Sequence, residues 1–393
     1  MSSIDSKGKL NRRTALKLAG LAASAAVLPR PSRAFADHRE SCLRTRLSSK
    51  FGLRVPLANA GMAFVALPEL AAAVSNAGAI GVYGVGPEPP PVLSARIAAI
   101  TARTTAVYGV DFILATTPMG PFTTQAHIDI AAGARVPIVV FHFDVPSAAW
   151  VSQLHAAGTT VWAQTGDVKV ALQCVAAGVD GIVAQGRSAG GHNKNSTIET
   201  FRLVKLMRKA LPPKIFILAS GGIADGESLV RAIRAGADGG WAGTVFVAAT
   251  ESYANQGYKQ RLITAHGDNA TILTTRLGPE FPDAPQRVLR VRATTEPLRT
   301  TPTTIGSTIL FPGVLNVPYT MPKYSAIVPT PDTTGDLEEM DMPAGAKSIK
   351  AVRAVRPAAA IVNDFIDGAR DACNRDDNDD NDDDDDDDES QAD

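Results

Sequence analysis

The sequence predicts an α/β protein whose body is a (β/α)8 (TIM) barrel, followed by a C-terminal extension and a disordered acidic tail. From Pro56 onward one unit repeats: a short β-branched strand, a turn, an Ala-rich amphipathic helix, and Ala-Gly or Gly-Ala before the next strand. The strands are nearly continuous apolar runs, as expected when both faces of a parallel sheet are buried. Strict alternation of these units fits a closed barrel, and an open, doubly wound sheet is the alternative.

The repeat assigns eight strands that alternate with seven helices. Gly78, Gly158, Gly178 and Gly236 each follow an expected helix, because the C-terminus of a helix often needs a residue with positive φ. The strands are expected at 57–60, 80–83, 106–113, 137–143, 160–164, 180–184, 215–219 and 240–246, and the helices at 70–77, 94–103, 128–134, 148–157, 168–177, 197–211 and 228–235.

The first 36 residues have the pattern of an export signal. Arg12 and Arg13 form a twin-arginine pair, which is followed by an apolar run at 18–28 and an A-x-A cleavage pattern at 34–36. A basic start, a short apolar segment and a small-residue site together mark a signal peptide, and the paired arginines favour the twin-arginine route. The apolar run is too short for a bilayer, which needs about 20 residues. We therefore expect export by the twin-arginine machinery, to the periplasm or beyond, and no membrane span.

Composition and charge restrict the class of partner. The chain has 393 residues, of which 45% are hydrophobic and 20% are charged, a globular composition. The formal net charge of −1 conceals an acidic end, because residues 376–393 hold thirteen acidic and no basic side chains. The remaining body carries about +6 once the signal is set aside. That excess suits an anionic cofactor and is too small to predict nucleic-acid binding.

The domain organisation follows from these composition changes. The start of the extension, at 296–343, is rich in Thr and Pro and has weak periodicity, so an extended segment over the barrel is expected. The tail cannot bury apolar area and should be disordered. The expected order is a signal peptide at 1–36, a lead-in at 37–55, the barrel at 56–295, an extension packing on the barrel at 296–372, and the acidic tail at 373–393.

Three cysteines are present. Cys42 and Cys373 flank the body and can pair in an oxidising compartment, but sequence does not give their separation, so their pairing stays open. Cys174 falls in an expected helix and reads as a small buried residue. The His and Cys residues show no metal-ligand spacing, so no metal site is predicted.

A glycine-rich loop with a histidine follows the sixth expected strand. It contains Gln185, Gly190 and His192. Glycines after a strand expose backbone N–H groups to a ligand, and a histidine titrates near neutral pH. The loop therefore indicates an anion-binding site with an acid/base group beside it. A tight turn with a solvated histidine is the alternative.

Further candidates lie at other strand ends, where (β/α)8 barrels carry their chemistry. Gly221 and Gly222 follow the seventh strand, and 241–244 ends the eighth. Glycine turns at these two places form the usual phosphate site of such barrels. His142 and Phe143 end the fourth strand and are candidates for a substrate pocket, with a hydrogen-bonded structural histidine as the alternative for His142.

Several segments, in the right order, resemble the nitronate monooxygenase family, formerly called 2-nitropropane dioxygenases. The stretch 184–192, AQGRSAGGH, resembles the family's V-Q-G-x-E-A-G-G-H segment, and 59–63, NAGMA, is similar to its A-P-M-A turn. The stretches 219–226, ASGGIADG, and 241–244, WAGT, match its flavin phosphate-binding turns. The resemblance covers roughly residues 50–367.

This resemblance implies a barrel with non-covalent FMN, which oxidises alkyl nitronates, and sometimes nitroalkanes, with O2 to a carbonyl compound and nitrite. It implies that His192 either acts as a base on a neutral nitroalkane or hydrogen-bonds the anionic nitronate. The residues that it places against the cofactor are Ala60, Gly61, Met62, Asp111, Gln185, Gly190, Gly221, Gly222, Trp241, Ala242, Gly243 and Thr244.

Three residues depart from the family pattern: Gly61 stands where Pro is usual, Asp111 where an Asn touches the flavin, and Ser188 where Glu is frequent. A carboxylate is unfavourable beside an anionic reduced flavin, so redox tuning and substrate preference stay open. A related FMN barrel that takes hydride from NAD(P)H, such as an enoyl or quinone reductase, is the alternative enzyme. A non-catalytic flavin-binding or surface protein is the alternative of another class.

Overall fold

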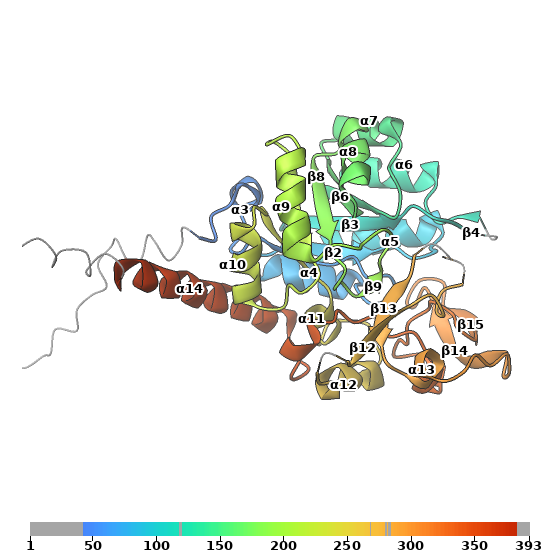
Figure 1. Ribbon diagram of the computed structural model, residues 1–393. Helices are drawn as coiled ribbons and strands as arrows, with labels where there is room; N and C mark the ends of the chain where they lie inside the picture. The colour runs from blue at the N-terminus through green and yellow to red at the C-terminus, as the bar shows by residue number, and fades with distance from the viewer. Residues whose placement is uncertain (1–41, 118–119, 268, 280, 282–283, 383–393) are drawn as a thin grey trace, which may run out of the picture. The chain divides into compact units, whose positions relative to one another are not determined.

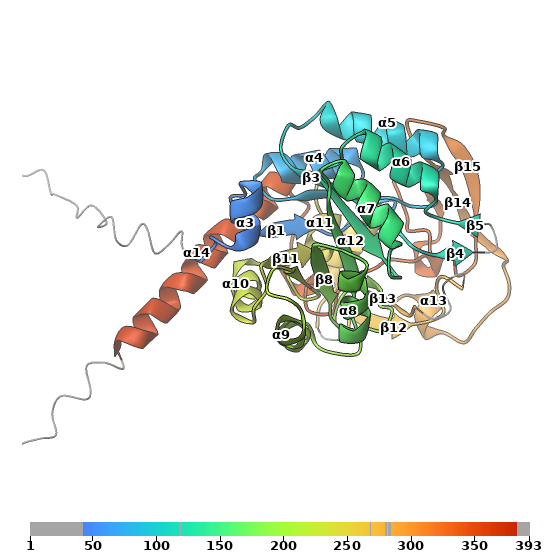
Figure 2. The same ribbon diagram turned by 90° about the horizontal axis from the view of Figure 1, so that it is seen from above.

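The computed structural model describes residues 42–117, 120–267, 269–279, 281 and 284–382. Within them, eight parallel strands form one sheet in the order β1-β11-β10-β8-β7-β6-β3-β2, and helices surround it (Figures 1 and 2). This is the predicted (β/α)8 barrel. The strands are β1 (Leu57–Asn59), β2 (Gly81–Gly84), β3 (Tyr108–Ile113), β6 (Ile138–His142), β7 (Thr160–Thr165), β8 (Gly181–Gln185), β10 (Phe216–Ser220) and β11 (Gly239–Ala242).

The helices alternate with the strands, as predicted, and two of them begin at an aspartate cap. Asp167 accepts hydrogen bonds from the backbone of the first turn of α8, and Asp225 does the same for α10. The helices of the barrel are α4 (Pro68–Asn76), α5 (Pro90–Thr101), α6 (Gln125–Gly133), α7 (Ala148–Ala156), α8 (Val168–Ala176), α9 (Thr200–Ala210), α10 (Gly226–Arg234) and α11 (Thr244–Val247), with α3 (Arg46–Phe51) before them in the predicted lead-in.

Backbone and side-chain hydrogen bonds together close the barrel between β1 and β2. The two strands meet in an isolated parallel bridge between Ala58 and Ile80. One residue further on, the fully buried amide of Asn59 accepts a hydrogen bond from Val82 N at 2.9 Å and donates one to Val82 O at 2.8 Å. The amide thus takes the place of a backbone rung at this seam. The open-sheet alternative is therefore excluded.

The last barrel strand is shorter than predicted. An apolar strand was expected at 240–246, but β11 ends at Ala242 and the chain continues as the short helix α11. All four residues of α11 are buried. A run that is buried on every side has no periodicity that distinguishes a short strand from a helix, which explains the error.

Two small antiparallel sheets lie beyond the barrel strands, and the second of them falls within the predicted extension at 296–372, which is therefore not a plain extended segment. In the first, β13 (Gln286–Leu289) lies between β12 (Thr271–Thr274) and β9 (Gly191–His192). In the second, β14 (Thr304–Leu310) lies between β15 (Val317–Pro322) and β16 (Thr334–Gly335). In β15 only one residue is buried, so the sequence lacks the alternation that predicts a strand. The remaining elements are β4 (Thr116–Thr117), β5 (Gly120–Pro121), α12 (Gln256–Thr264), α13 (Arg292–Thr295), η1 (Leu337–Glu339) and η2 (Ile349–Ala351).

Helix α14 (Ala358–Asp382) ends the described chain and packs against α10 and α4 (Figure 1). Its buried face includes Phe365 and Ala369. Cys373 of this helix forms a disulfide with Cys42, which answers the question that the sequence left open. The helix continues past the predicted tail boundary at 373 to Asp382, so the first residues of the predicted tail are helical and not disordered. The acidic residues 383–393 and the predicted signal peptide at 1–36 lie outside the described residues.

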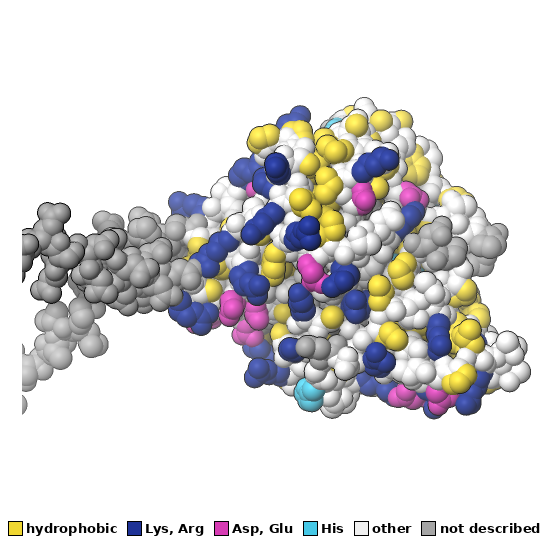
Figure 3. Space-filling view, in the orientation of Figure 1, with side chains coloured by type: hydrophobic (Ala, Val, Ile, Leu, Met, Phe, Trp, Pro, Cys, Tyr) yellow, Lys and Arg dark blue, Asp and Glu magenta, His cyan; other side chains and the backbone are white. Residues whose placement is uncertain are grey.

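Basic side chains are prominent on the face that carries α9 and α10 (Figure 3). Helix α9 contributes the exposed Arg202, Lys205 and Lys209 to it. This agrees with the positive charge of the body. Among the described residues, no helix combines the length and the apolar character that crossing a membrane requires.

The disulfide should contribute measurably to stability. Because it joins residues 331 positions apart, it constrains the unfolded chain strongly, and its loss should cost about 2–5 kcal/mol of the free energy of unfolding. We predict a lower unfolding midpoint for Cys373→Ser, measured by thermal or denaturant unfolding. A reductant should lower the wild-type midpoint to the same value and leave that of the variant unchanged. Equal midpoints for oxidised wild type and variant would contradict this.

Candidate active site

A cavity of about 490 Å³ lies at the C-terminal ends of the barrel strands. Its size is typical of cofactor and small-molecule sites, which are about 300–1,000 Å³. The extension forms its other side with, among others, Tyr319 and Lys323. Asp111, Gly222 and Ala242 are the predicted site residues that do not line it. Those that do are Ala60, Gly61, Met62, His142, Phe143, Gln185, Gly190, His192, Gly221, Trp241, Gly243 and Thr244.

His192 is held in a defined orientation in β9. Its Nδ1 lies 2.8 Å from the carbonyl oxygen of Ala284. Because a carbonyl only accepts hydrogen bonds, Nδ1 carries the proton and Nε2 carries the lone pair. Gln185 fixes the backbone, since its Nε2 donates to His192 O at 2.8 Å. Burial lowers the pKa of His192 to about 4 against the opposing effect of the Ala284 hydrogen bond. The imidazole is therefore neutral at pH 7, and its Nε2 can take up a proton.

A second neutral imidazole lies in the same wall. His142 ends β6, and its Nε2 is 3.4 Å from Gln164 Nε2. Burial lowers the pKa of His142 to about 3, with smaller contributions from the charges of His192 and Lys194. His142 also lines the cavity.

Aromatic rings surround the His192 imidazole. The centroid of Phe281 lies 4.8 Å from that of His192 and 5.4 Å from that of Phe143, and Phe122 meets Phe281 edge-on at 5.7 Å. Phe143 has a φ of 88°, a conformation that is unfavourable for a bulky residue. Strain of this kind is retained where the surroundings fix a functional geometry. The reacting end of the cavity is therefore apolar apart from a few polar groups.

Two glycine turns provide a cradle for an anion. Gly221 and Gly222 follow β10 with φ values of 107° and 81°, and Gly243 follows β11. A backbone N–H without an acceptor is poorly satisfied unless a ligand binds it. Several such groups from adjacent turns match the oxygens of a phosphate. Within the described residues, the N–H groups in these turns that donate to no protein acceptor are those of Gly221, Gly222, Gly243 and Thr244.

Asp111 lies behind the cavity wall, against Gly61. A Cβ built on Gly61 would be only 2.3 Å from Asp111 Cβ, so the carboxyl side chain fills the space of a side chain at position 61. Asp111 is 4% exposed, and its Oδ1 has no partner among the described residues. Burial raises the pKa of Asp111 well above its usual range. Burial therefore disfavours the charged carboxylate here, which reduces the charge repulsion expected beside a reduced flavin.

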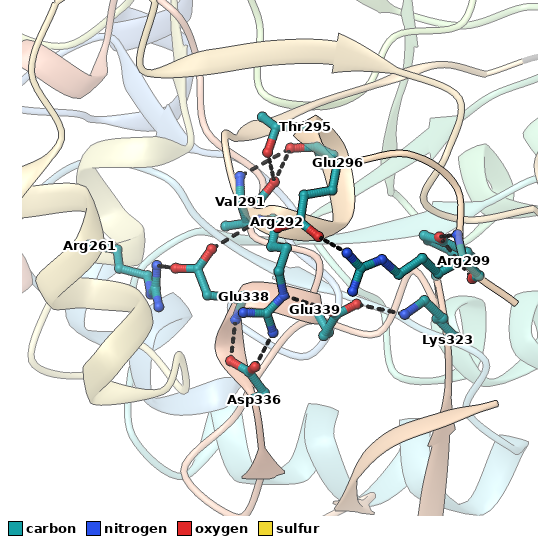
Figure 4. A network of polar contacts seen from close by, with 12 residues as sticks. Arg261, Val291, Arg292, Thr295, Glu296, Arg299, Lys323, Asp336, Glu338 and Glu339 are labelled. Atoms are coloured by element: carbon teal, nitrogen blue, oxygen red, sulfur yellow. Dashed lines mark hydrogen bonds and ion pairs between the residues drawn. The ribbon is translucent and has the colours of Figure 1, made fainter. Parts of the chain in front are cut away.

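The cover of the cavity is fixed by ion pairs (Figure 4). The amine of Lys323, in the cavity wall, binds Glu339 at 3.0 Å, and Glu339 also binds Arg292 at 2.8 Å. The neighbouring Glu338 pairs with Arg261 of α12. Sequence reasoning placed an extension over the barrel but did not predict these ion pairs, because most of their residues come from a segment without periodicity.

Among the described residues, no group of three or more His, Cys, Asp or Glu side chains is arranged to hold a metal ion.

A barrel with a glycine cradle, an apolar cavity and a buried histidine at its strand ends is the arrangement found in enzymes that bind a phosphate-bearing cofactor. The chain belongs to the nitronate monooxygenase family, whose model matches residues 44–368. It is 32% identical over 252 residues to a nitronate monooxygenase of Paraburkholderia phytofirmans, covering 54% of this chain and 68% of that one.

Two solved structures are similar over most of this chain. FabK from Thermotoga maritima gives a TM-score of 0.67 at 27% identity, covering 84% of this chain and 98% of that one. A nitroalkane oxidase from Streptomyces ansochromogenes gives 0.67 at 25%, covering 84% and 99%. The family consists of flavoenzymes, and the protein is an FMN-type oxidoreductase.

The contact between Gly61 and Asp111 yields a test of the site geometry. Gly61→Ala should lower the free energy of unfolding by about 1–3 kcal/mol, because the new methyl group overlaps Asp111. Adding Asp111→Gly should recover part of this loss, and a double-mutant cycle in denaturant measures the coupling. Gly133→Ala is the matched control, since nothing lies within 4 Å of a Cβ there. Strictly additive effects at 61 and 111 would disprove the contact.

Proposed function

We propose that the protein binds FMN in this cavity and oxidises alkyl nitronates, and nitroalkanes after deprotonation, with O2 to a carbonyl compound and nitrite. The observation that carries the proposal is the lone pair of His192 Nε2 in an apolar cavity beside the two glycine turns. The family and the similar nitroalkane oxidase structure support this chemistry.

The residues present fit FMN. Gly221, Gly222, Gly243 and Thr244 offer backbone donors to its phosphate, and Ala60, Met62 and Trp241 line the adjoining wall. When bound, FMN supplies the electron acceptor for the organic substrate and passes the electrons to O2. The protein supplies orientation, an apolar environment and a base.

The tautomer of His192 favours the role of base over that of hydrogen-bond donor. Its only N–H is engaged by Ala284, so Nε2 faces the substrate with a lone pair. A neutral nitroalkane has an acidic hydrogen on the carbon that bears the nitro group. The lone pair of His192 Nε2 can accept this hydrogen as a proton. A nitronate has already lost that proton and needs a donor from elsewhere in the wall.

The removal of His192 should separate the two substrates. His192→Ala should lower kcat/KM for nitroethane by about 10²–10⁴-fold and affect ethyl nitronate far less, with flavin content unchanged. In wild type, kcat/KM for nitroethane should increase as pH rises through about 4, the pKa of His192, because only the neutral ring accepts a proton. His266→Ala, at an exposed position, is the control. An equal loss for both substrates would contradict the base role.

The decisive test of the function is anaerobic addition of propyl nitronate to the purified protein. Bleaching of flavin absorbance, followed by nitrite release when oxygen is admitted, supports the proposal. Bleaching by NAD(P)H and not by nitronate would transfer the function to the alternative FMN reductase. A protein that cannot be reconstituted with FMN would refute the cofactor.

We also propose that the protein is exported by the twin-arginine route. The Cys42–Cys373 disulfide supports this, because disulfides persist in oxidising compartments. Arg12→Lys combined with Arg13→Lys should leave the protein in the cytoplasm, as measured by cell fractionation. Arg30→Lys with Arg33→Lys, outside the pair, should not. Normal export of the first variant would disprove the route.

A further inference from the structure

The side-chain amide of Gln286 is buried at the cavity without an acceptor. Gln286 begins β13, is 1% exposed, and belongs to the cavity wall. Its Nε2 is buried and has no hydrogen-bond partner among the described residues. A buried amide N–H without an acceptor costs free energy that a bound oxygen atom would recover. The side-chain N–H groups of Gln286 are therefore available to donate a hydrogen bond to a ligand.

This amide lies beside the His192 ring. Gln286 and His192 are direct partners across the antiparallel pair of β13 and β9. A Cβ built on Gly278 would be 3.0 Å from Gln286 Nε2 and 3.1 Å from His192 Cε1, so both groups converge on that glycine. The next residue along β13, Arg287, points the other way and donates to Arg187 O. The pleat of β13 thus directs Gln286 inward.

The other amides in the wall are already engaged. Gln185 donates to His192 O at 2.8 Å, and Gln164 lies 3.4 Å from His142 Nε2. The amine of Lys323 is paired with Glu339. An anionic head group beside His192 therefore has the amide of Gln286 as an unengaged donor next to it.

We propose that Gln286 Nε2 donates a hydrogen bond to a nitro or nitronate oxygen and holds that group next to Nε2 of His192. This proposal rests on the proposed function and adds to it the donor that the neutral His192 lacks. The strand pairing of β9 and β13 then aligns a donor for the oxygens with a base for the carbon-bound proton. Gln286 is thereby a catalytic residue, since it touches the substrate.

Two variants test the donor. Gln286→Met keeps the length of the side chain and removes the N–H groups. It should lower kcat/KM for propyl nitronate about tenfold or more, mostly through KM, in line with the loss of a hydrogen bond to a charged group. Gln286→Glu keeps the shape and adds a negative charge. At pH 8 it should impair the anionic nitronate at least tenfold more than neutral nitropropane. Gln260→Glu, on the exposed side of α12, adds the same charge away from the cavity and should have no effect.

A binding measurement separates this proposal from the proposed function. Propionate carries a two-oxygen anion like that of a nitronate, and its Kd can be measured by isothermal titration calorimetry without turnover. Both Gln286 variants should weaken propionate binding about tenfold. If wild type fails to oxidise nitronates but shows this loss, the function is wrong and the donor role stands. If folded Gln286→Met keeps both its nitronate KM and its propionate Kd within twofold of wild type, the donor role is refuted.

Discussion

The geometry of the site depends on the hydrogen bonds that close the barrel between β1 and β2. Asn59 replaces a backbone rung between β1 and β2 with two side-chain hydrogen bonds. The closed ring places the carboxyl ends of β2, β3 and β6 across the barrel from those of β1, β11, β10 and β8. His142, at the end of β6, therefore lines the same cavity as the glycine turns and the histidine loop. A polar side chain in a barrel core is costly unless it is fully paired, and the side chain of Asn59 is.

The sequence predicted much of the barrel and less of its cover. The eight strands were predicted from apolar runs, which indicate burial, and the turns were predicted from glycines. Only the last strand was predicted to be several residues too long. Gln286, Phe281 and Lys323 were missed, because strand pairing and the folding of an aperiodic segment bring them to the cavity. The disulfide could not be decided, since a separation along the chain gives no distance in space.

Two departures from the family pattern have one structural explanation. At position 61 the chain has no side chain, and the carboxyl of Asp111 occupies the space that this leaves. Taken alone, Gly61 suggests a loose turn, and Asp111 suggests an unfavourable charge. Together they form a packed contact behind the cavity wall. Comparing one position at a time with a family motif does not reveal such a pair, because the two substitutions make sense only when their contact in the folded structure is known.

The disulfide also changes what damage the molecule can tolerate. Since Cys42 and Cys373 are covalently joined, everything between them is one closed covalent loop. A protease that cuts a single surface turn in that loop opens it without releasing any fragment, and both new ends remain attached to the same folded body. A single nick therefore need not separate the halves of the barrel, which matters most in the extracytoplasmic compartment to which we propose that the protein is exported.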